Sequence, residues 1–187
     1  MWVGGQRSLQ LSDRSQLAMA RANQEAIRLR HQYVGTEHIL LGLLKEKGGQ
    51  ALRILAELGP ELDAIRTSVE AASPPGHEPV ITGKPLTLTS RASKVLEYAA
   101  AEARSAGRET VGTSDLLMGL VLQSTGVAAH VLKLLNIDVE KVRKVAGRLH
   151  QSVAPPEPTA ATFQIHLDDK SEKSIYEQIV GAVQEAV

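Results

Sequence analysis

The feature that most constrains this chain is an internal repeat with an offset of 77 residues. Gly35–Leu43 aligns with Gly112–Leu120 without a gap, and the same offset relates further residues on both sides. These further pairs are Leu11 and Leu88, Arg14 and Arg91, Ala22 and Ala99, Glu25 and Glu102, Gly49 and Gly126, Leu55 and Leu132, and Arg66 and Arg143. A repeat of this length predicts two copies of one structural unit that bury a shared core.

Each copy is expected to contain four helices. Apolar residues recur at helical spacing over residues 13–30 and 90–107, which predicts one long amphipathic helix in each copy. Thr36 and Thr113 are the predicted N-caps of the second helices. The third and fourth helices follow glycine-containing breaks and carry Ile54, Leu55, Ile65 and Val69 in one copy and Val131, Leu132, Val142 and Val145 in the other. We therefore predict an all-α, pseudo-twofold tandem repeat of two four-helix units, which is an eight-helix bundle.

Composition narrows the classes of function. Only 3% of the residues are aromatic and 43% are hydrophobic, which favours close-packed aliphatic helices. The 21 basic and 21 acidic residues cancel, so no overall charge attracts nucleic acid or anionic lipid. The chain has no cysteine, no apolar stretch near the ~18 residues of a membrane span and no signal-peptide pattern. We expect a cytoplasmic protein without membrane or nucleic-acid partners.

Proline-rich segments predict the domain boundaries. We expect an N-terminal extension over 1–11, a repeat domain over 12–150 with copies 12–72 and 88–150 and a linker 73–87, a second linker over 151–162, and a tail over 163–187. The tail is expected to form a short strand and one helix, which begins at a capping box of Ser174 and Glu177. Its apolar face predicts a homodimer through Ile175, Ile179, Val180 and Val183.

The doubled pattern Arg-x(20)-Gly-Thr-[Glu/Ser]-[His/Asp]-[Ile/Leu]-Leu-[Leu/Met]-Gly-Leu resembles the N-terminal domain of Clp-family unfoldases, in particular the ClpC type. The resemblance covers residues 12–150. It implies a non-catalytic module that binds protein substrates or adaptors ahead of the ATPase rings of a Clp unfoldase or protease. The chain has no phosphate-binding Gly-x-x-x-x-Gly-Lys-[Ser/Thr] loop, so we expect no nucleotide or other cofactor.

A second, shorter resemblance supplies an alternative function. Residues 163–168 and 174–180 are similar to the opening of GntR-type winged-helix regulators, although the recognition helix and the wing are absent. In this alternative the helical bundle is the sensor domain of a transcriptional regulator whose DNA-binding part is truncated. The chain alone would then still not read a base sequence.

The Clp resemblance also implies candidate ligand residues. In the ClpC type, the matching positions bind phosphorylated arginine, with a hydroxyl and helix-start groups on the phosphate and a glutamate on the guanidinium. Grouped by repeat, these positions are Ser12, Arg14 and Glu37 in the first copy, and Thr89, Arg91 and Ser114 in the second. Serine cannot replace the carboxylate, so at most one set is complete. The alternative is that Ser12 and Thr89 only cap helices and that Glu37 only complements a helix dipole.

No catalytic or metal-binding set is expected. The six histidines show no ligand spacing, and His31 and His38 lie seven residues apart. No serine or threonine has a recognisable base, so we predict that the chain is not an enzyme. Glu25 and Glu102 are expected to be solvated or ion-paired, and core packing is the favoured role of Leu17, Tyr33 and Tyr98, with the border of a peptide groove as the alternative.

Overall fold

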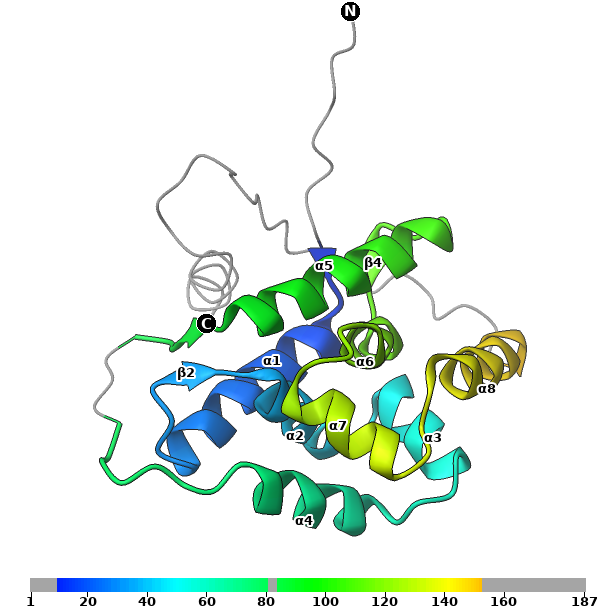
Figure 1. Cartoon of the computed structure of the whole chain (residues 1–187). Coiled ribbons are helices and arrows are strands. Elements are labelled where there is room, and N and C mark those ends of the chain that lie inside the picture. Colours follow the sequence, from blue (N-terminus) through cyan, green and yellow to red (C-terminus); the bar gives the residue numbers. More distant parts are fainter. Residues whose placement is uncertain (1–9, 81–83, 153–187) are drawn as a thin grey trace, which may run out of the picture.

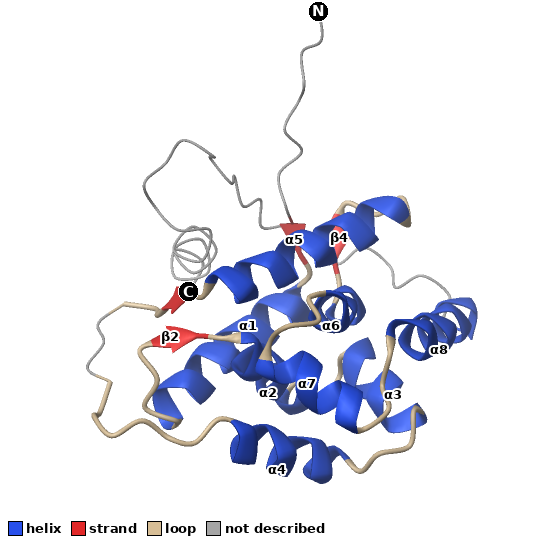
Figure 2. Cartoon of the chain, in the orientation of Figure 1, coloured by secondary structure: helices blue, strands red, loops and turns tan. Residues whose placement is uncertain are grey.

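The computed structural model describes residues 10–80 and 84–152 (Figure 1). These residues form eight helices and four very short strands (Figure 2). The helices of the first repeat are α1 (Asp13–Arg28), α2 (Thr36–Lys45), α3 (Gln50–Glu57) and α4 (Leu62–Ala72). Those of the second repeat are α5 (Ser90–Ser105), α6 (Thr113–Leu122), α7 (Val127–Leu134) and α8 (Val139–Ser152). The predicted all-α fold of two four-helix units is confirmed.

The four strands connect one repeat to the other. Strand β1 (Gln10–Leu11) pairs in parallel with β4 (Thr110–Val111), and β2 (Tyr33–Val34) pairs in parallel with β3 (Thr87–Leu88). The sequence pattern does not predict them, because a two-residue strand is too short to show alternating hydrophobicity. Each pairing places a helix start of one repeat beside a helix start of the other.

The core is aliphatic and lies around α2 and α6. In α2 every residue except Lys45 is buried. A Cβ atom at Gly42 would overlap the backbone of Ala18 in α1, and one at Gly119 would overlap Val95 in α5. The two glycines therefore allow the central helix of each repeat to pack directly against the backbone of the long helix.

The predicted capping role of Thr36 and Thr113 is wrong for their own helices. The N-caps of α2 and α6 are Gly35 and Gly112. The Thr36 hydroxyl instead accepts a hydrogen bond from the Ala128 amide at the start of α7 (3.4 Å), and the Thr113 hydroxyl accepts one from the Ala51 amide at the start of α3 (3.2 Å). Each threonine thus caps a helix of the opposite repeat, which is a tertiary contact that local sequence does not reveal.

The predicted tail strand and tail helix, including Ile175, Ile179, Val180 and Val183, lie outside the described residues. Within 10–80 and 84–152, no single helix is long and apolar enough to cross a membrane. Helices α6 and α7 meet the length and composition criteria only as a pair bent by 89°.

Candidate functional site

The candidate ligand residues are grouped across the repeats. Thr89 donates its amide to the Val34 carbonyl (3.0 Å), which places the start of α5 beside the start of α2. Ser12 donates its amide to the Val111 carbonyl (3.0 Å), which places the start of α1 beside the start of α6. The grouping by repeat that the sequence suggested therefore changes: Glu37 lies with Thr89 and Arg91 of the second copy.

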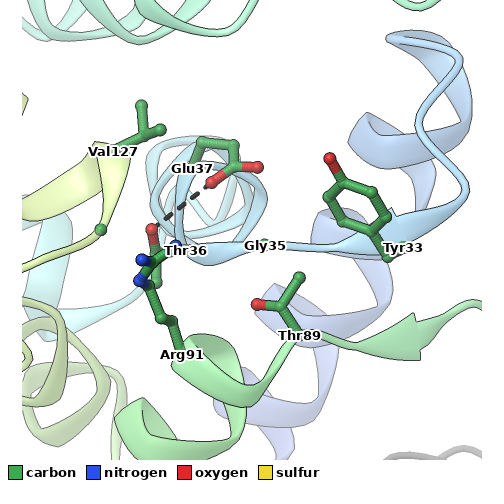
Figure 3. A pocket seen from close by; sticks show the side chains of 8 residues that line it. Tyr33, Gly35, Thr36, Glu37, Thr89, Arg91 and Val127 are labelled. Atoms are coloured by element: carbon green, nitrogen blue, oxygen red, sulfur yellow. Dashed lines mark hydrogen bonds between the residues drawn. The ribbon is translucent and has the colours of Figure 1, made fainter.

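A pocket of about 230 Å³ lies where these two helix starts meet. We call it the Glu37 pocket. Figure 3 shows Glu37 approaching it from α2, while Thr89 and Arg91 approach it from the start of α5. Its lining residues are Tyr33, Gly35, Thr36, Glu37, Thr89, Arg91, Gly126 and Val127. The pocket thus combines one carboxylate and one guanidinium with the hydroxyls of Tyr33, Thr36 and Thr89.

Glu37 has no cationic partner in the part of the chain that the structure describes. The residue is only 7% exposed, and among the described residues only Thr36 donates a hydrogen bond to its carboxylate, from the hydroxyl at 3.4 Å. The Nδ1 atom of His38 lies 3.6 Å from the carboxylate, but it accepts a hydrogen bond from the Gly35 amide (2.8 Å) and so carries no proton. A buried carboxylate without a counter-ion favours an external cation, and a guanidinium fits its two oxygens.

The opposite side of the pocket favours an anion. Arg91 is exposed and forms no ion pair with any described residue. The Thr89 hydroxyl accepts from the Ala92 amide (3.1 Å), so Thr89 is the N-cap of the 16-residue helix α5. The amides of Ser90 and Arg91 have no partner within the helix and carry the positive end of its dipole. A phosphate at this helix start would meet both the amides and the Arg91 side chain.

The neighbouring histidines form a hydrogen-bonded chain. His38 Nε2 donates to His31 Nδ1 (2.9 Å), and His31 Nε2 then donates to the Pro74 carbonyl (3.0 Å). We assign these proton positions from the Gly35 amide, which makes His38 Nδ1 an acceptor. Burial, with smaller effects from His31 and Arg28, lowers the pKa of His38 to about 3, so the ring is neutral.

This histidine pair was not predicted, although comparison of the two repeats contains a signal for it. Residues 31 and 38 correspond to Arg108 and Asp115, which form a bidentate ion pair at 2.6 and 2.7 Å. His31, Glu37 and His38 offer ligand atoms within 4.8 Å of one another. The ring nitrogens of both histidines are already hydrogen-bonded, and the absence of a metal site stays a prediction.

The pseudo-equivalent position beside α1 is paired internally. Arg14 forms an ion pair with Glu46 (3.2 Å), and the Ser114 hydroxyl donates to Gln50 (3.2 Å). Ser12 accepts from the Ser15 amide (3.3 Å) as the N-cap of α1. The predicted capping roles of Ser12 and Thr89 are therefore confirmed.

Other residues singled out in the sequence also have defined surroundings. Glu25 is buried and bonds to Arg28 and Lys45, while Glu102 bonds to Arg143, so the predicted ion pairs are confirmed. The favoured core role is wrong for three apolar residues, whose exposed fractions are 39–48%. These residues are Leu17, Tyr33 and Tyr98. Of them, Tyr33 borders the Glu37 pocket.

Comparisons with known proteins place the chain in a family. The Clp repeat (R) N-terminal domain matches residues 10–135 and 87–170. The negative regulator of genetic competence ClpC/MecB of Bacillus subtilis is 41% identical over 133 residues, which are 71% of this chain and 16% of that protein. The chain thus spans about a sixth of the length of the curated relatives that it matches.

Solved structures share the fold. The N-terminal domain of the chaperone ClpD from Arabidopsis thaliana superposes with a TM-score of 0.61 at 22% identity, over 79% of this chain and 99% of that one. The ClpV N-domain in complex with a VipB peptide superposes with a TM-score of 0.61 at 18% identity, over 78% and 89% of the two chains. The chain belongs to the Clp repeat N-terminal domain family.

Proposed function

We propose that this chain is a protein-binding module that recruits substrates or adaptor proteins for Clp-linked unfolding and proteolysis, and that it binds them without catalysing a reaction. Its membership of the Clp N-terminal family supports this function. The ClpV N-domain, which has the same fold, has been solved with a VipB peptide. The absence of cysteine is compatible with a site of action in the cytoplasm.

The Glu37 pocket is the proposed binding site, and its proposed ligand is the side chain of a phosphorylated arginine. One observation carries this assignment: the buried carboxylate of Glu37 and the side chain of Arg91 line one pocket, and neither forms an ion pair with an oppositely charged Lys, Arg, Asp or Glu among residues 10–80 and 84–152. The guanidinium of the ligand would bind Glu37, and its phosphate would bind Arg91 and the start of α5. The other candidate residues, Ser12 and Arg14, have structural roles in this proposal: Ser12 caps α1 and Arg14 pairs with Glu46.

The rim of the pocket suits the rest of a peptide. Tyr33 is 48% exposed, and Val127 lies on the opposite repeat at the start of α7. Aromatic and aliphatic side chains of this kind give a peptide apolar contact area beside a charged anchor. A phosphorylated arginine within a peptide should therefore bind more tightly than the free amino acid.

Calorimetric titration tests the ligand assignment. We expect saturable binding of phosphoarginine and little binding of arginine or phosphoserine, since each of these lacks one of the two charges. The Glu37→Gln and Arg91→Ala variants should each lose about tenfold or more in affinity, because each leaves a ligand charge unpaired. Glu97→Gln and Lys94→Ala make the same charge changes at exposed positions of α5 and should bind as the wild type does. Equal binding of all three ligands would contradict the assignment.

The alternative function, a truncated GntR-like regulator, receives no support from the comparisons. The Clp repeat match extends to residue 170 and so includes residues 163–168, the first of the two segments on which that resemblance rested. A homodimer through Ile175, Ile179, Val180 and Val183 stays a prediction. If the tail forms the dimer, truncation at Ala154 should convert the protein to a monomer, as measured by its mass in solution. An unchanged oligomeric state would contradict dimerisation through the tail.

A further inference from the structure

The two repeat-related arginines lie in different surroundings. Arg14 and Arg91 occupy the same position of α1 and α5, two residues after the N-caps Ser12 and Thr89. Arg14 is bound to Glu46, whereas Arg91 forms no ion pair with a described residue. The residues that face each arginine from its own repeat differ in two ways.

The first difference is that the carboxylate of Glu46, a hydrogen-bond acceptor, is replaced by the side-chain amide of Gln123, whose nitrogen is a donor. Glu46 is buried; its Oε2 accepts from the Gly48 amide (2.9 Å), and its Oε1 accepts from Arg14. Gln123 occupies the equivalent position, and its Oε1 accepts from the Thr125 amide (3.2 Å) in the same way. Its second group is the Nε2 amide, which donates to the Thr125 hydroxyl (3.1 Å). An amide nitrogen cannot accept from a guanidinium, so Gln123 keeps the turn but provides no partner for Arg91.

The second difference is steric. A Cβ atom at Gly48 would overlap the Arg14 guanidinium, so a side chain at residue 48 would force Arg14 out of the conformation in which it binds Glu46. The equivalent residue of the second repeat is Thr125, whose side chain occupies that space. Arg91 therefore lacks both the acceptor and the room for the conformation of Arg14. It extends toward Thr36 at the Glu37 pocket instead (Figure 3).

We propose that residues 46 and 48, together with their equivalents 123 and 125, determine which of the two arginines is available to an anion. Glu46 and Gly48 hold Arg14 in an internal ion pair, and Gln123 and Thr125 leave Arg91 free. The domain then has one anion-binding position although its fold has two. This inference rests on the proposed function for the identity of the ligand, but the availability of each arginine can be measured without that ligand.

Chemical labelling of the wild-type protein provides the first test. Phenylglyoxal modifies arginine side chains, and mass spectrometry of the peptides gives a rate for each one. We expect Arg91 to react roughly two- to fivefold faster than Arg14, the ratio that one ion pair of a half-exposed arginine supports. Equal rates, or a faster reaction of Arg14, would overturn the inference.

Reciprocal grafts provide the second test. The double variant Gln123→Glu, Thr125→Gly copies the first repeat into the second and should slow the labelling of Arg91 to the rate of Arg14. It should also weaken phosphoarginine binding about two- to fivefold, because the ligand then competes with an internal ion pair of Arg91. The reverse graft, Glu46→Gln, Gly48→Thr, should accelerate the labelling of Arg14 and leave the affinity of the Glu37 pocket unchanged. Gly48 has no positive φ, so threonine fits its backbone.

The outcomes separate the two proposals. Wild-type protein that binds no phosphoarginine, but whose labelling rates differ and exchange with the grafts, would contradict the proposed ligand and support the present inference. Wild-type protein that binds phosphoarginine, but whose labelling and affinity do not respond to the grafts, would support the ligand and overturn the present inference. Circular dichroism before each measurement verifies that a graft has folded.

Discussion

At the scale of single residues, the two repeats perform one capping task with different chemistry. The third residue of α2 is His38 and that of α6 is Asp115, and each accepts from the amide of its N-cap glycine at 2.8 Å. The partner of Asp115 is an arginine, while the partner of His38 is a second histidine, His31. Of the two versions, only the histidine pair contains a side-chain type whose ordinary pKa lies near neutrality.

This difference predicts acid sensitivity in the first repeat. The folded-state pKa of His38 is lowered to about 3, chiefly by burial, so folding favours the neutral ring. The stabilisation is complete above the unfolded pKa of ~6.5 and decreases as the pH falls toward 3, with a loss of about 2 kcal/mol by pH 5. Urea unfolding at pH 7 and pH 5 measures it.

The second repeat supplies the control. The double variant His31→Arg, His38→Asp copies the pair Arg108 and Asp115 and so removes both histidines from this position. It should lose less stability than the wild type over this range. Equal losses in the two proteins would show that the histidine pair is not responsible.

Arg30 provides a separate prediction. It follows α1 with a φ of 57°, while its equivalent Gly107 follows α5 with a φ of 71°. Glycine adopts this left-handed conformation without the strain that a Cβ atom causes, so Arg30→Gly should raise the free energy of unfolding by about 1 kcal/mol. Arg30→Ala, which removes the side chain but keeps Cβ, is the control and should not stabilise the protein. Thermal unfolding measures both, and a less stable Arg30→Gly protein would contradict the argument.

At the scale of elements, the repeat pattern predicted the helices well, because apolar spacing and glycine breaks are local signals. It predicted neither the short strands nor the exchange of caps between repeats, since both depend on contacts that are distant in sequence. The site also depends on a contact that is distant in sequence. Thr89, Arg91 and Glu37 were each identified from the sequence, but the pairing of β2 with β3 brings them together.

The exchanged caps can be tested by removing a hydroxyl. Thr36→Val and Thr113→Val should each lower the free energy of unfolding by about 1 kcal/mol, because each leaves a helix-start amide of the opposite repeat without an acceptor. Hydrogen exchange should accelerate at Ala128 in the first variant and at Ala51 in the second. Thr67→Val is the matched control, since Thr67 is exposed and bonds only within α4. Loss of protection in the mutated repeat alone would contradict the exchange.

At the scale of the whole molecule, neither repeat has a complete core. Helix α3 packs against α6 and α8 of the second repeat, and α4 packs against α7. We therefore expect a fragment of residues 10–80 to show no cooperative urea transition, because its inward faces would be exposed to water. Circular dichroism measures this. A cooperative transition in the isolated fragment would mean that the repeats fold independently.

The proposed site also depends on both repeats. In the Glu37 pocket, Glu37 comes from the first repeat, while Thr89 and Arg91 come from the second. Titration of ¹⁵N-labelled protein with phosphoarginine tests this most directly. We expect saturable shifts at the amides of Gly35–Glu37 and Ser90–Ala92 together, with one affinity, and none at Ser12–Arg14. Shifts confined to one repeat would contradict a single site built across the repeats. Equal shifts where α2 and α5 start and where α1 and α6 start would contradict it as well.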